Sequence, residues 1–404
     1  MTSTQNSATL RLPSLVDGTK SSAVPLAWRN FVSNGPRLIR SLAGISFATL
    51  LMMTELGFYD AFIGSNLLPI RDLDGDIMLV SSTKYEFARS APFPRRQFHE
   101  ARAVPGVASV RPVYIKRYAI WKNPQNQKIF DVQVFAFDPD QPVFLLPEIN
   151  AQLDALRQPD SVIVDRRARS HIGTARAGTE TELAYRRIRV VGTFSLGPSF
   201  FAHGTVVMSD WNFLKLFGSG TSNLEGIPDL NVGVVKLLPG QDASAVQRAL
   251  QGVLPPNVIA LTKSELIDKE AKYLAQYMAV GPVFGIATLV GFAVGMLISY
   301  QILFSELTDQ LPQYATLTAM GYRSGYLCKV VLQQGLLYAV LGYAPAWMLC
   351  QLIFKLIGDV ALIPMRVTAG LTAASLALTV AMCIGAALLA VRRVITADPA
   401  ELLR

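Results

Sequence analysis

Four long hydrophobic runs constrain this 404-residue chain more than any other feature of its sequence. They span residues 37–63, 278–304, 329–357 and 369–391. An α-helix needs about 20 apolar residues to cross a hydrocarbon core ~30 Å thick, and every run is that long. Because a spanning segment in lipid must satisfy its own backbone hydrogen bonds, the runs predict helices. We therefore expect an α-helical integral membrane protein with four transmembrane helices.

The stretch between the first two runs, residues 64–277, has a soluble composition. It holds 25 basic and 21 acidic residues, whereas the whole chain is 51% hydrophobic and only 16% charged. Half of the formal net charge of +8 therefore lies inside this stretch and half outside. Since no concentrated basic patch results, nucleic acid is an unfavourable partner. We expect a large domain outside the membrane.

This outer domain is predicted to be α/β. Apolar runs rich in β-branched residues alternate with one helical stretch in each half, which indicates two β-α-β halves of one discontinuous subdomain. The strand-rich pieces between the halves predict an inserted β-rich subdomain. The first half comprises a strand at 76–80, a helix at 95–103 and a strand at 107–115, and the second comprises a strand at 232–237, a helix at 243–253 and a strand at 257–261. The strands of the insert are expected at 129–137, 161–165, 187–194 and 205–208.

The return to the membrane begins with a helix-start signal. Thr262 and Glu265 have the spacing of a capping box, in which each side chain bonds the backbone N–H of the other residue. The apolar pattern then continues without a break, so one helix of ~60 Å is expected from 263 to 304. Its first part, 262–277, would form a stalk outside the membrane, with Pro282 as a kink near the interface.

A stripe of small residues follows on the same helix. Gly281, Gly285, Gly291 and Gly295 form two GxxxG pairs within one arc of ~120°. Such a stripe permits close approach of a second helix. The neighbour can belong to the same subunit or to a second copy of the chain, and spacing alone does not decide between them.

A short segment between the second and third runs, within 305–328, contains residues that are typical of the two ends of a helix. Pro312 suits the first turn of a helix and Gly321 the position after its last turn. Tyr314, Leu317 and Met320 recur three apart and share one face. This pattern predicts a short amphipathic helix at a membrane surface, and the alternative is an ordinary loop between helices.

Basic residues indicate the orientation, because cytoplasmic loops carry an excess of Lys and Arg. They flank the runs on one side, which places both termini and the 305–328 segment in the cytoplasm. Residues 1–23 have the composition of a disordered tail, 24–36 of an interfacial helix, and 392–404 of a cytoplasmic tail. The flanking residues are Arg29, Arg37, Arg40, Arg323, Lys329, Arg392, Arg393 and Arg404.

No constellation of catalytic or metal-binding residues occurs. The sequence lacks a GxxxxGK[ST] phosphate loop, so work driven by ATP needs another chain. The histidines His99, His171 and His203 are not at metal-ligand spacing, and the three cysteines lie in or beside the hydrophobic runs. We therefore predict a non-catalytic chain without a metal or a cofactor of its own.

Several motifs together resemble a known family. They are the lead-in PLAWRNFVSNGPRLIR, the segment LPQYATLTAMGY and the terminal VRRVITADPAELLR, in an order that resembles the FtsX/MacB superfamily of ABC-transporter permeases. Two longer motifs, RYAIWKNPQNQKIFDVQVFAFDPDQPVFLLPEIN and VVGTFSLGPSFFAHGTVVMSDWNFLKLF, are similar to DevC-like permeases of DevBCA-type exporters. The resemblance covers the chain from about residue 23 to its end.

The resemblance implies a homodimer that transmits the motion of a separate ATPase, which binds ATP and Mg, to the outer domain. It also implies a periplasmic adaptor, a TolC-like outer-membrane protein, an inner-membrane location and a lipid or other amphipathic cargo. The departure is that Gln310, Gln313 and Thr318 are neutral where the superfamily has charges. The docking residues it implies are Leu311, Pro312, Gln313, Tyr314, Ala315, Thr316, Leu317, Met320 and Gly321.

Two alternatives stay open at this point. The chain can be an FtsX-type transmembrane signaller that regulates a cell-wall hydrolase, or a lipoprotein-releasing permease. A neighbouring hydrolase or lipoprotein chaperone would favour these, whereas an adaptor and an ATPase would favour the exporter.

Overall fold

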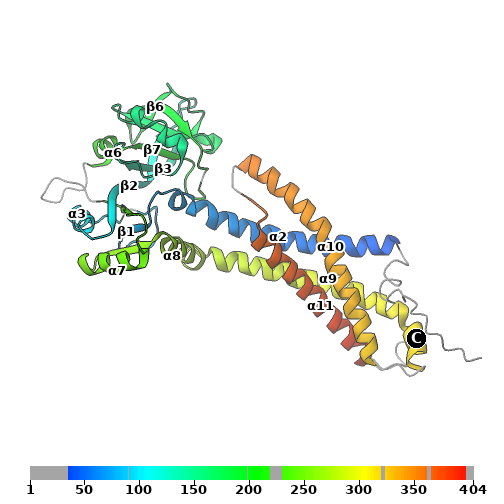
Figure 1. Cartoon of the computed structure of the whole chain (residues 1–404). Coiled ribbons are helices and arrows are strands. Elements are labelled where there is room, and N and C mark those ends of the chain that lie inside the picture. Colours follow the sequence, from blue (N-terminus) through cyan, green and yellow to red (C-terminus); the bar gives the residue numbers. More distant parts are fainter. Residues whose placement is uncertain are drawn as a thin grey trace, which may run out of the picture.

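The computed structural model describes residues 35–89, 91–197, 199–218, 230–319, 324–361 and 365–396. A bundle of long helices forms one part of the molecule and an α/β domain the other (Figure 1). Within the described residues, four helices are long and apolar enough to cross a membrane. The predicted fold class is thereby confirmed. The four helices are α2 (Gly35–Arg71), α9 (Val280–Ala319), α10 (Ser324–Ala361) and α11 (Ala369–Thr396).

The four helices of the bundle form a ring in cross-section, and two of them, α2 and α11, also contact each other across its centre. α2 and α11 each contact all three other helices, whereas α9 and α10 scarcely meet. Small residues allow the close approach: a side chain on Gly335 would press on Cys383 of α11, and one on Gly342 on Ile45 of α2. Buried hydroxyls also pair between helices, as Thr49 and Thr379 do at 3.2 Å.

The first subdomain of the outer domain is a four-stranded antiparallel sheet with two helices. The strand order is β2-β8-β1-β9, which is the ferredoxin-like arrangement of two β-α-β halves. The two predicted halves are therefore present. The first half is β1 (Ile77–Ser81), α3 (Arg96–Arg102) and β2 (Val107–Lys122), and the second is β8 (Val232–Leu237), α7 (Ala243–Val253) and β9 (Val258–Thr262).

The second subdomain is the predicted β-rich insert. Its strands follow the order β2-β3-β7-β4-β6-β5 and return to β2, so the sheet closes on itself and exposes no edge for pairing with another chain. The elements are β3 (Ile129–Phe137), α4 (Pro147–Asn150), α5 (Leu153–Leu156), β4 (Ser161–Asp165), η1 (Ser170–Ile172), β5 (Glu180–Leu183), β6 (Arg186–Phe194), β7 (Thr205–Ser209) and α6 (Asp210–Phe217).

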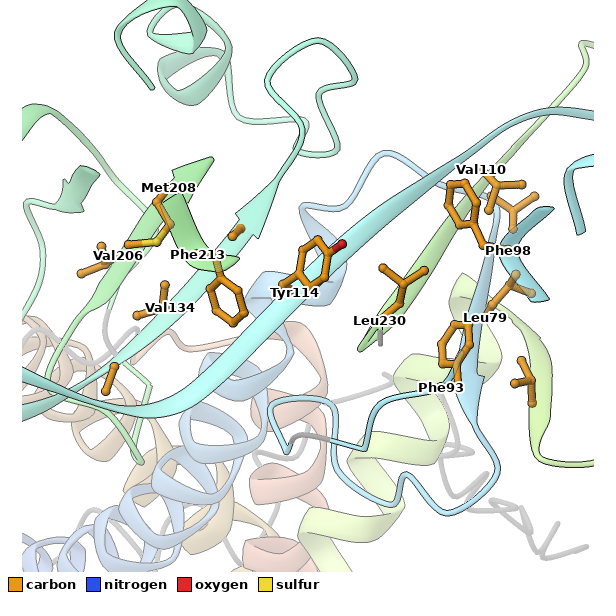
Figure 2. Packing of buried hydrophobic residues seen from close by; sticks show 14 of the residues in the cluster. Leu79, Phe93, Phe98, Val110, Tyr114, Val134, Val206, Met208, Phe213 and Leu230 are labelled. Carbon is orange, nitrogen blue, oxygen red and sulfur yellow. The ribbon is translucent and has the colours of Figure 1, made fainter. Parts of the chain in front are cut away.

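One long strand, β2, belongs to both subdomains. It pairs with β8 up to Val113 and with β3 from Val113 onward, with a register shift between Lys116 and Ala119 inside the second pairing, and its end also pairs with β5. Apolar side chains on one side of this strand form a single buried cluster from Leu79 and Phe93 to Tyr114, Val134 and beyond (Figure 2). The two subdomains therefore share one core.

The first span is longer than predicted. It was expected to end at residue 63, but α2 continues to Arg71. The polar side chain of Asn66 donates to the carbonyl of Phe62 at 2.8 Å, while Leu67 and Ile70 are buried against the outer domain. The last two turns are thus stabilised by the outer domain after the hydrophobic run has ended. The predicted tail 1–23, residues 24–34 of the predicted interfacial helix and residues 397–404 lie outside the described residues.

Candidate functional site

The predicted docking segment is at the end of α9 that lies away from the outer domain (Figure 1). Leu311 packs against the apolar core of the bundle, and Pro312 is exposed. For residues 313–319 the structure describes the helical backbone and no side chains, so their docking role stays a prediction. Gln313, Tyr314, Ala315, Thr316 and Leu317 all lie on α9, and Met320 and Gly321 lie outside the described residues.

The expectation of a separate helix beginning at Pro312 is wrong, because α9 runs from Val280 to Ala319 without a break. A proline inside a helix removes one backbone hydrogen bond and costs about 3 kcal/mol. Leu307 and Leu311, in the turn before it, pack in the bundle core and hold this part of the helix in place. The docking segment and the second span are therefore one helix ~60 Å long.

The other end of α9 shows a second difference. The stalk helix α8 (Lys263–Gln276) ends before α9 begins, so the predicted unbroken helix from 263 to 304 is wrong. Three residues, Tyr277, Met278 and Ala279, separate the helices, and we call them the joint. Ala279 has a φ of 55°, a left-handed conformation that costs an alanine about 1 kcal/mol.

Pro282 does not kink a continuous helix, as had been expected. It lies in the first turn of α9, where a missing N–H costs nothing because that group would be unpaired in any case. The break between the stalk and the span thus lies at the joint, before Pro282. The start of α8 has the expected capping box: Thr262 accepts from the N–H of Glu265, and Glu265 accepts from the N–H of Thr262 at 2.8 Å.

The predicted glycine stripe divides into two pairs with different surroundings. A side chain on Gly291 would press on Met52 of α2 at 3.3 Å, and one on Gly295 on Ala48 of α2 at 2.7 Å. These two glycines therefore pack within the subunit. Gly281 faces the last turn of α8, and Gly285 has open space around its Cβ position, so neither contributes to the packing of α2 against α9.

The end of α2 and the start of α8 are held together by Lys263. Its ammonium group donates to the carbonyls of Arg71 and Leu73, both at 2.7 Å. A cation at the C-terminal end of a helix is also favoured by the helix dipole. Because the lysine is partly buried there, its pKa is lowered, and Asp72 nearby acts in the opposite sense. The end of the membrane helix α2 and the start of the stalk α8 are thus joined at the outer domain.

A buried group of charges lies beside this entry. Lys84 and Glu86 come from the loop after β1, Arg117 from β2 and Glu270 from α8, and we call these four residues the junction cluster. Arg117 forms an ion pair with Glu86, and Glu270 accepts a hydrogen bond from the N–H of Phe87 at 2.8 Å. Lys84 donates to the carbonyl of Arg89 at 2.6 Å. The cluster ties the stalk to two segments of the outer domain.

Burial dominates the protonation equilibria of the cluster. Glu270 is 4% exposed, and the loss of solvent raises the pKa of its carboxyl to about 7. The same effect lowers the pKa of Lys84 to about 8, with Glu270 and Glu86 opposing it. Burial also raises the pKa of Glu86, which the neighbouring Arg117 partly offsets. Two members of the cluster, Glu270 and Lys84, therefore have pKa values of about 7 and about 8.

Aromatic side chains extend the cluster toward α2. The guanidinium of Arg117 lies 4.4 Å from the ring centre of Phe201, and that ring is 5.6 Å from the ring of Phe62 at the outer end of α2. Such a cation–π contact adds about 1 kcal/mol. The membrane helix α2 and the stalk α8 therefore both reach the surroundings of Arg117, α2 through Phe62 and Phe201 and α8 through Glu270.

A row of three tyrosines, Tyr85, Tyr273 and Tyr277, lies beside α8, and Tyr273 is the member on the helix itself. Tyr273 lies 5.1 Å from Tyr85 of the outer domain and 5.7 Å from Tyr277 of the joint, measured between ring centres. Tyr277 is 78% exposed. Tyrosines are typical of the zone where a helix enters the headgroup region. Such a row predicts that the joint lies near a membrane surface.

Replacing Glu270 with glutamine will remove a pH dependence of stability. A carboxyl whose pKa is raised by folding stabilises the folded state fully below about pH 4.5, and this contribution is lost as the pH rises through about 7. The loss amounts to at most about 3 kcal/mol. Lys84, with its lowered pKa, changes stability above pH 8 and leaves this window unaffected.

The measurement is urea unfolding of the full chain in detergent at pH 5.0 and pH 7.5. Glu270→Gln keeps an acceptor for the N–H of Phe87, so the expected change is a smaller difference between the two pH values. Asp268→Asn, on the exposed side of the same helix, serves as the control and keeps the wild-type difference. An unchanged difference in Glu270→Gln would show that this carboxyl is ionised throughout.

One feature of the sequence predicts part of the junction cluster. Glu270 lies four residues from Leu266 and four from Leu274, and all three are buried. A carboxylate between two leucines of one helix face indicates a buried acid. Its partners at 84, 86 and 117 have no such signal, because the fold alone brings them together.

Two histidines that are distant in sequence also meet. The ring centres of His171 and His203 are 5.8 Å apart, and Phe130 stacks on the first. In the part of the chain that the structure describes, no three His, Cys, Asp or Glu side chains gather as a metal site would require. The pair therefore belongs to the packing of the insert.

These features define a multi-pass membrane-protein architecture with an α/β outer domain joined to the spans at α2 and α8. Residues 282–399, which include almost all of α9, all of α10 and all of α11, match the family described as FtsX-like permease C-terminal. This match accords with the FtsX part of the resemblance seen in the sequence. A search of curated proteins finds no match.

Solved structures of two domains are similar to part of the chain. The periplasmic region of MacB from Actinobacillus actinomycetemcomitans has 12% identity and a TM-score of 0.35, over 49% of this chain and 92% of that chain. The extracellular domain of the noncanonic ABC-type transporter YknZ from Gram-positive bacteria has 13% identity and a TM-score of 0.31, over 46% of this chain and 98% of that chain.

Proposed function

We propose that this chain is the membrane subunit of an ABC exporter. The observation that carries the proposal is the match of residues 282–399 to the FtsX-like permease family. The sequence has no phosphate-binding loop, so the ATP and Mg would be bound by a partner ATPase. This chain would transmit the motion of that partner and would catalyse no reaction itself.

The continuous helix α9 supports a mechanical role. Its far end holds the proposed docking residues Tyr314 and Leu317, and its near end meets the stalk at the joint. A displacement at the far end is carried along one helix, because no loop interrupts it. At the joint the motion would pass to α8, whose buried Glu270 is anchored in the outer domain and whose Lys263 is anchored at the end of α2. The outer domain would then move relative to its adaptor or cargo.

The partners follow from the same proposal. We expect a homodimer in the inner membrane, with both termini in the cytoplasm, an ABC ATPase on the cytoplasmic side, and a periplasmic adaptor with a TolC-like duct on the other. The cargo would be a lipid or another amphipathic molecule, as in DevC-like exporters. The orientation is supported by Arg392 and Arg393 near the end of α11, because arginines concentrate on the cytoplasmic side.

Affinity purification of the tagged full chain from the membranes of its source organism tests this proposal. We expect an ABC ATPase to co-purify, and mass spectrometry of the eluate will identify it. Labelling of single cysteines placed at Thr316 and Lys236 with a membrane-impermeant reagent will give the topology. We expect Lys236→Cys to react in intact cells and Thr316→Cys to react only after permeabilisation.

Other proteins in the eluate would favour a different function for the chain. A cell-wall hydrolase in the eluate without an adaptor would favour the FtsX-type signaller, and a lipoprotein chaperone would favour a lipoprotein-releasing permease. An eluate with no ATPase, or equal labelling of the two cysteines, would contradict the membrane-subunit role itself.

A further inference from the structure

The last strand of the ferredoxin-like sheet, β9, has one edge that no other described strand pairs with. β1 lies on one side of β9, in an antiparallel register that runs from Ile77 opposite Thr262 to Ser81 opposite Val258. The strand order ends at β9, so its other side is an outer edge of the sheet. Because the backbone groups of alternate residues point to opposite edges, this outer edge presents the groups of Val258, Ala260 and Thr262.

Side chains of α7 occupy this edge in place of a strand. The side-chain amide of Gln251 accepts from the N–H of Ala260 at 3.1 Å and donates to the carbonyl of Val258 at 3.2 Å. It thus bonds β9 as the peptide group of a neighbouring strand would. Gln247, one turn earlier on the same helix, donates to the carbonyl of Ala260 at 3.0 Å.

The other outward N–H groups of β9 also have partners. The N–H of Val258 donates to the carbonyl of Pro255 at 3.0 Å, and the N–H of Thr262 donates to the carboxylate of Glu265 at 2.8 Å. The same carboxylate accepts from the side chain of Gln247 at 2.6 Å. The helix α7, the start of the stalk and the turn before β9 therefore close this edge together.

The residues of β9 explain why a closed edge matters. The strand reads VIALT and contains no charged residue and no proline, which are features that commonly keep an edge strand from pairing with another chain. Val258 and Ala260 are 0% and 2% exposed, so the strand itself is apolar and buried. Two copies of such a strand fit one another, because a twofold axis brings the same edge of each copy together in antiparallel orientation.

We propose that Gln247 and Gln251 form a cover that keeps β9 from pairing with β9 of a second copy of this chain. Gln251 is exposed and Gln247 is partly exposed, so the cover consists of hydrogen bonds made at the protein surface. An incoming strand offers the same donors and acceptors as the two amides. The edge is therefore closed only while both glutamines are in place. This inference concerns the outer domain alone and does not depend on a partner ATPase.

Binding of a fluorescent peptide to the purified full chain in detergent tests the cover. The peptide has the β9 sequence NVIALT, flanked by lysines for solubility, and fluorescence anisotropy measures its binding. We expect Q247A/Q251A to bind this peptide with an affinity roughly tenfold or more above that of the wild type, because three side-chain hydrogen bonds no longer compete with it. A peptide with proline in place of its alanine lacks the central N–H and will not bind.

The matched control changes the next residue after each glutamine. Arg248 and Gly252 are exposed on α7, and the space around the Cβ position of Gly252 is open, so R248A/G252A will bind the peptide as weakly as the wild type. Hydrogen exchange provides a second measurement: the amide of Ala260 will exchange roughly tenfold faster in Q247A/Q251A than in the wild type. Thermal unfolding of each variant will confirm that it is folded.

Three results would overturn the proposal. The first is peptide binding by Q247A/Q251A that equals that of the wild type, and the second is an equal gain in R248A/G252A. The third is equal binding of the proline peptide, which would show adhesion to an apolar surface without strand pairing.

Discussion

Replacing Leu317 with glutamate will release the ABC ATPase from the purified chain. Leu317 lies on the far end of α9, in the segment where Tyr314 and Leu317 share one face in the sequence. With neutral Gln310 and Gln313 in place of charges, docking would depend on apolar fit, and a buried carboxylate removes such a fit. A central interface residue of this kind contributes 2 kcal/mol or more, which corresponds to a loss of affinity of about 30-fold.

The measurement is the ratio of ATPase to tagged chain after affinity purification. Tyr277→Glu is the control, because it introduces the same charge at an exposed aromatic residue of the joint, about 60 Å away along α9. We expect the control to keep the wild-type ratio. A normal ratio for Leu317→Glu, or an equal loss in both variants, would argue against docking at this end of the helix.

Replacing Arg117 with leucine will strongly destabilise the outer domain. The arginine and its partner Glu86 are 14% and 4% exposed, so the substitution leaves a buried carboxylate without its cation. Breaking a buried pair in this way costs about 3–5 kcal/mol. The variant also removes the contact with Phe201, and with it part of the link to α2.

Urea unfolding of the full chain, followed by tryptophan emission to which the buried Trp121 of the outer domain contributes, measures this effect. Arg187→Leu is the control, because its pair with Glu180 is 80% and 51% exposed and contributes at most about 1 kcal/mol. The double variant E86L/R117L removes both charges, and we expect it to recover much of the lost stability. Equal loss in the single and double variants would mean that packing, and not the uncompensated charge, sets the cost.

Much of the fold could be predicted from the sequence, because the spacing of apolar residues determines where individual helices and strands form. The helix Ala243–Val253 and the strand Ile129–Phe137 have the predicted bounds. In each case turn residues or caps lie beside a clear pattern, as Asp242 does when it accepts from the N–H of Ser244. Local signals of this kind need no knowledge of distant segments.

The errors lie where tertiary contacts override a local signal. Pro312 has the features of a helix start, yet packing of Leu311 in the bundle keeps α9 continuous. Ala279 has no feature of a break, yet its left-handed backbone separates α8 from α9. The end of α2 follows its contacts with the outer domain and not the end of the hydrophobic run.

The junction cluster could be predicted only in part. Glu270 stands out on the buried face of α8, but its partners come from segments more than 150 residues earlier in the chain. A groove between α9 and α11, with Ala293 and Leu297 on one wall and Leu389 on the other, likewise depends on the register of two helices that are distant in sequence. In both places the separate helices and strands were predictable, but the contacts between their side chains depend on how the elements are arranged in space.

The most direct test of the central claim is site-specific photo-crosslinking in native membranes. A photo-reactive amino acid in place of Thr316 probes the far end of α9, and one in place of Tyr277 probes the joint. If the chain is the membrane subunit of an ABC exporter, the Thr316 probe will form a covalent adduct with an ABC ATPase, and the Tyr277 probe will not. An ATPase adduct from Tyr277, or none from Thr316 while the complex co-purifies, would contradict this account.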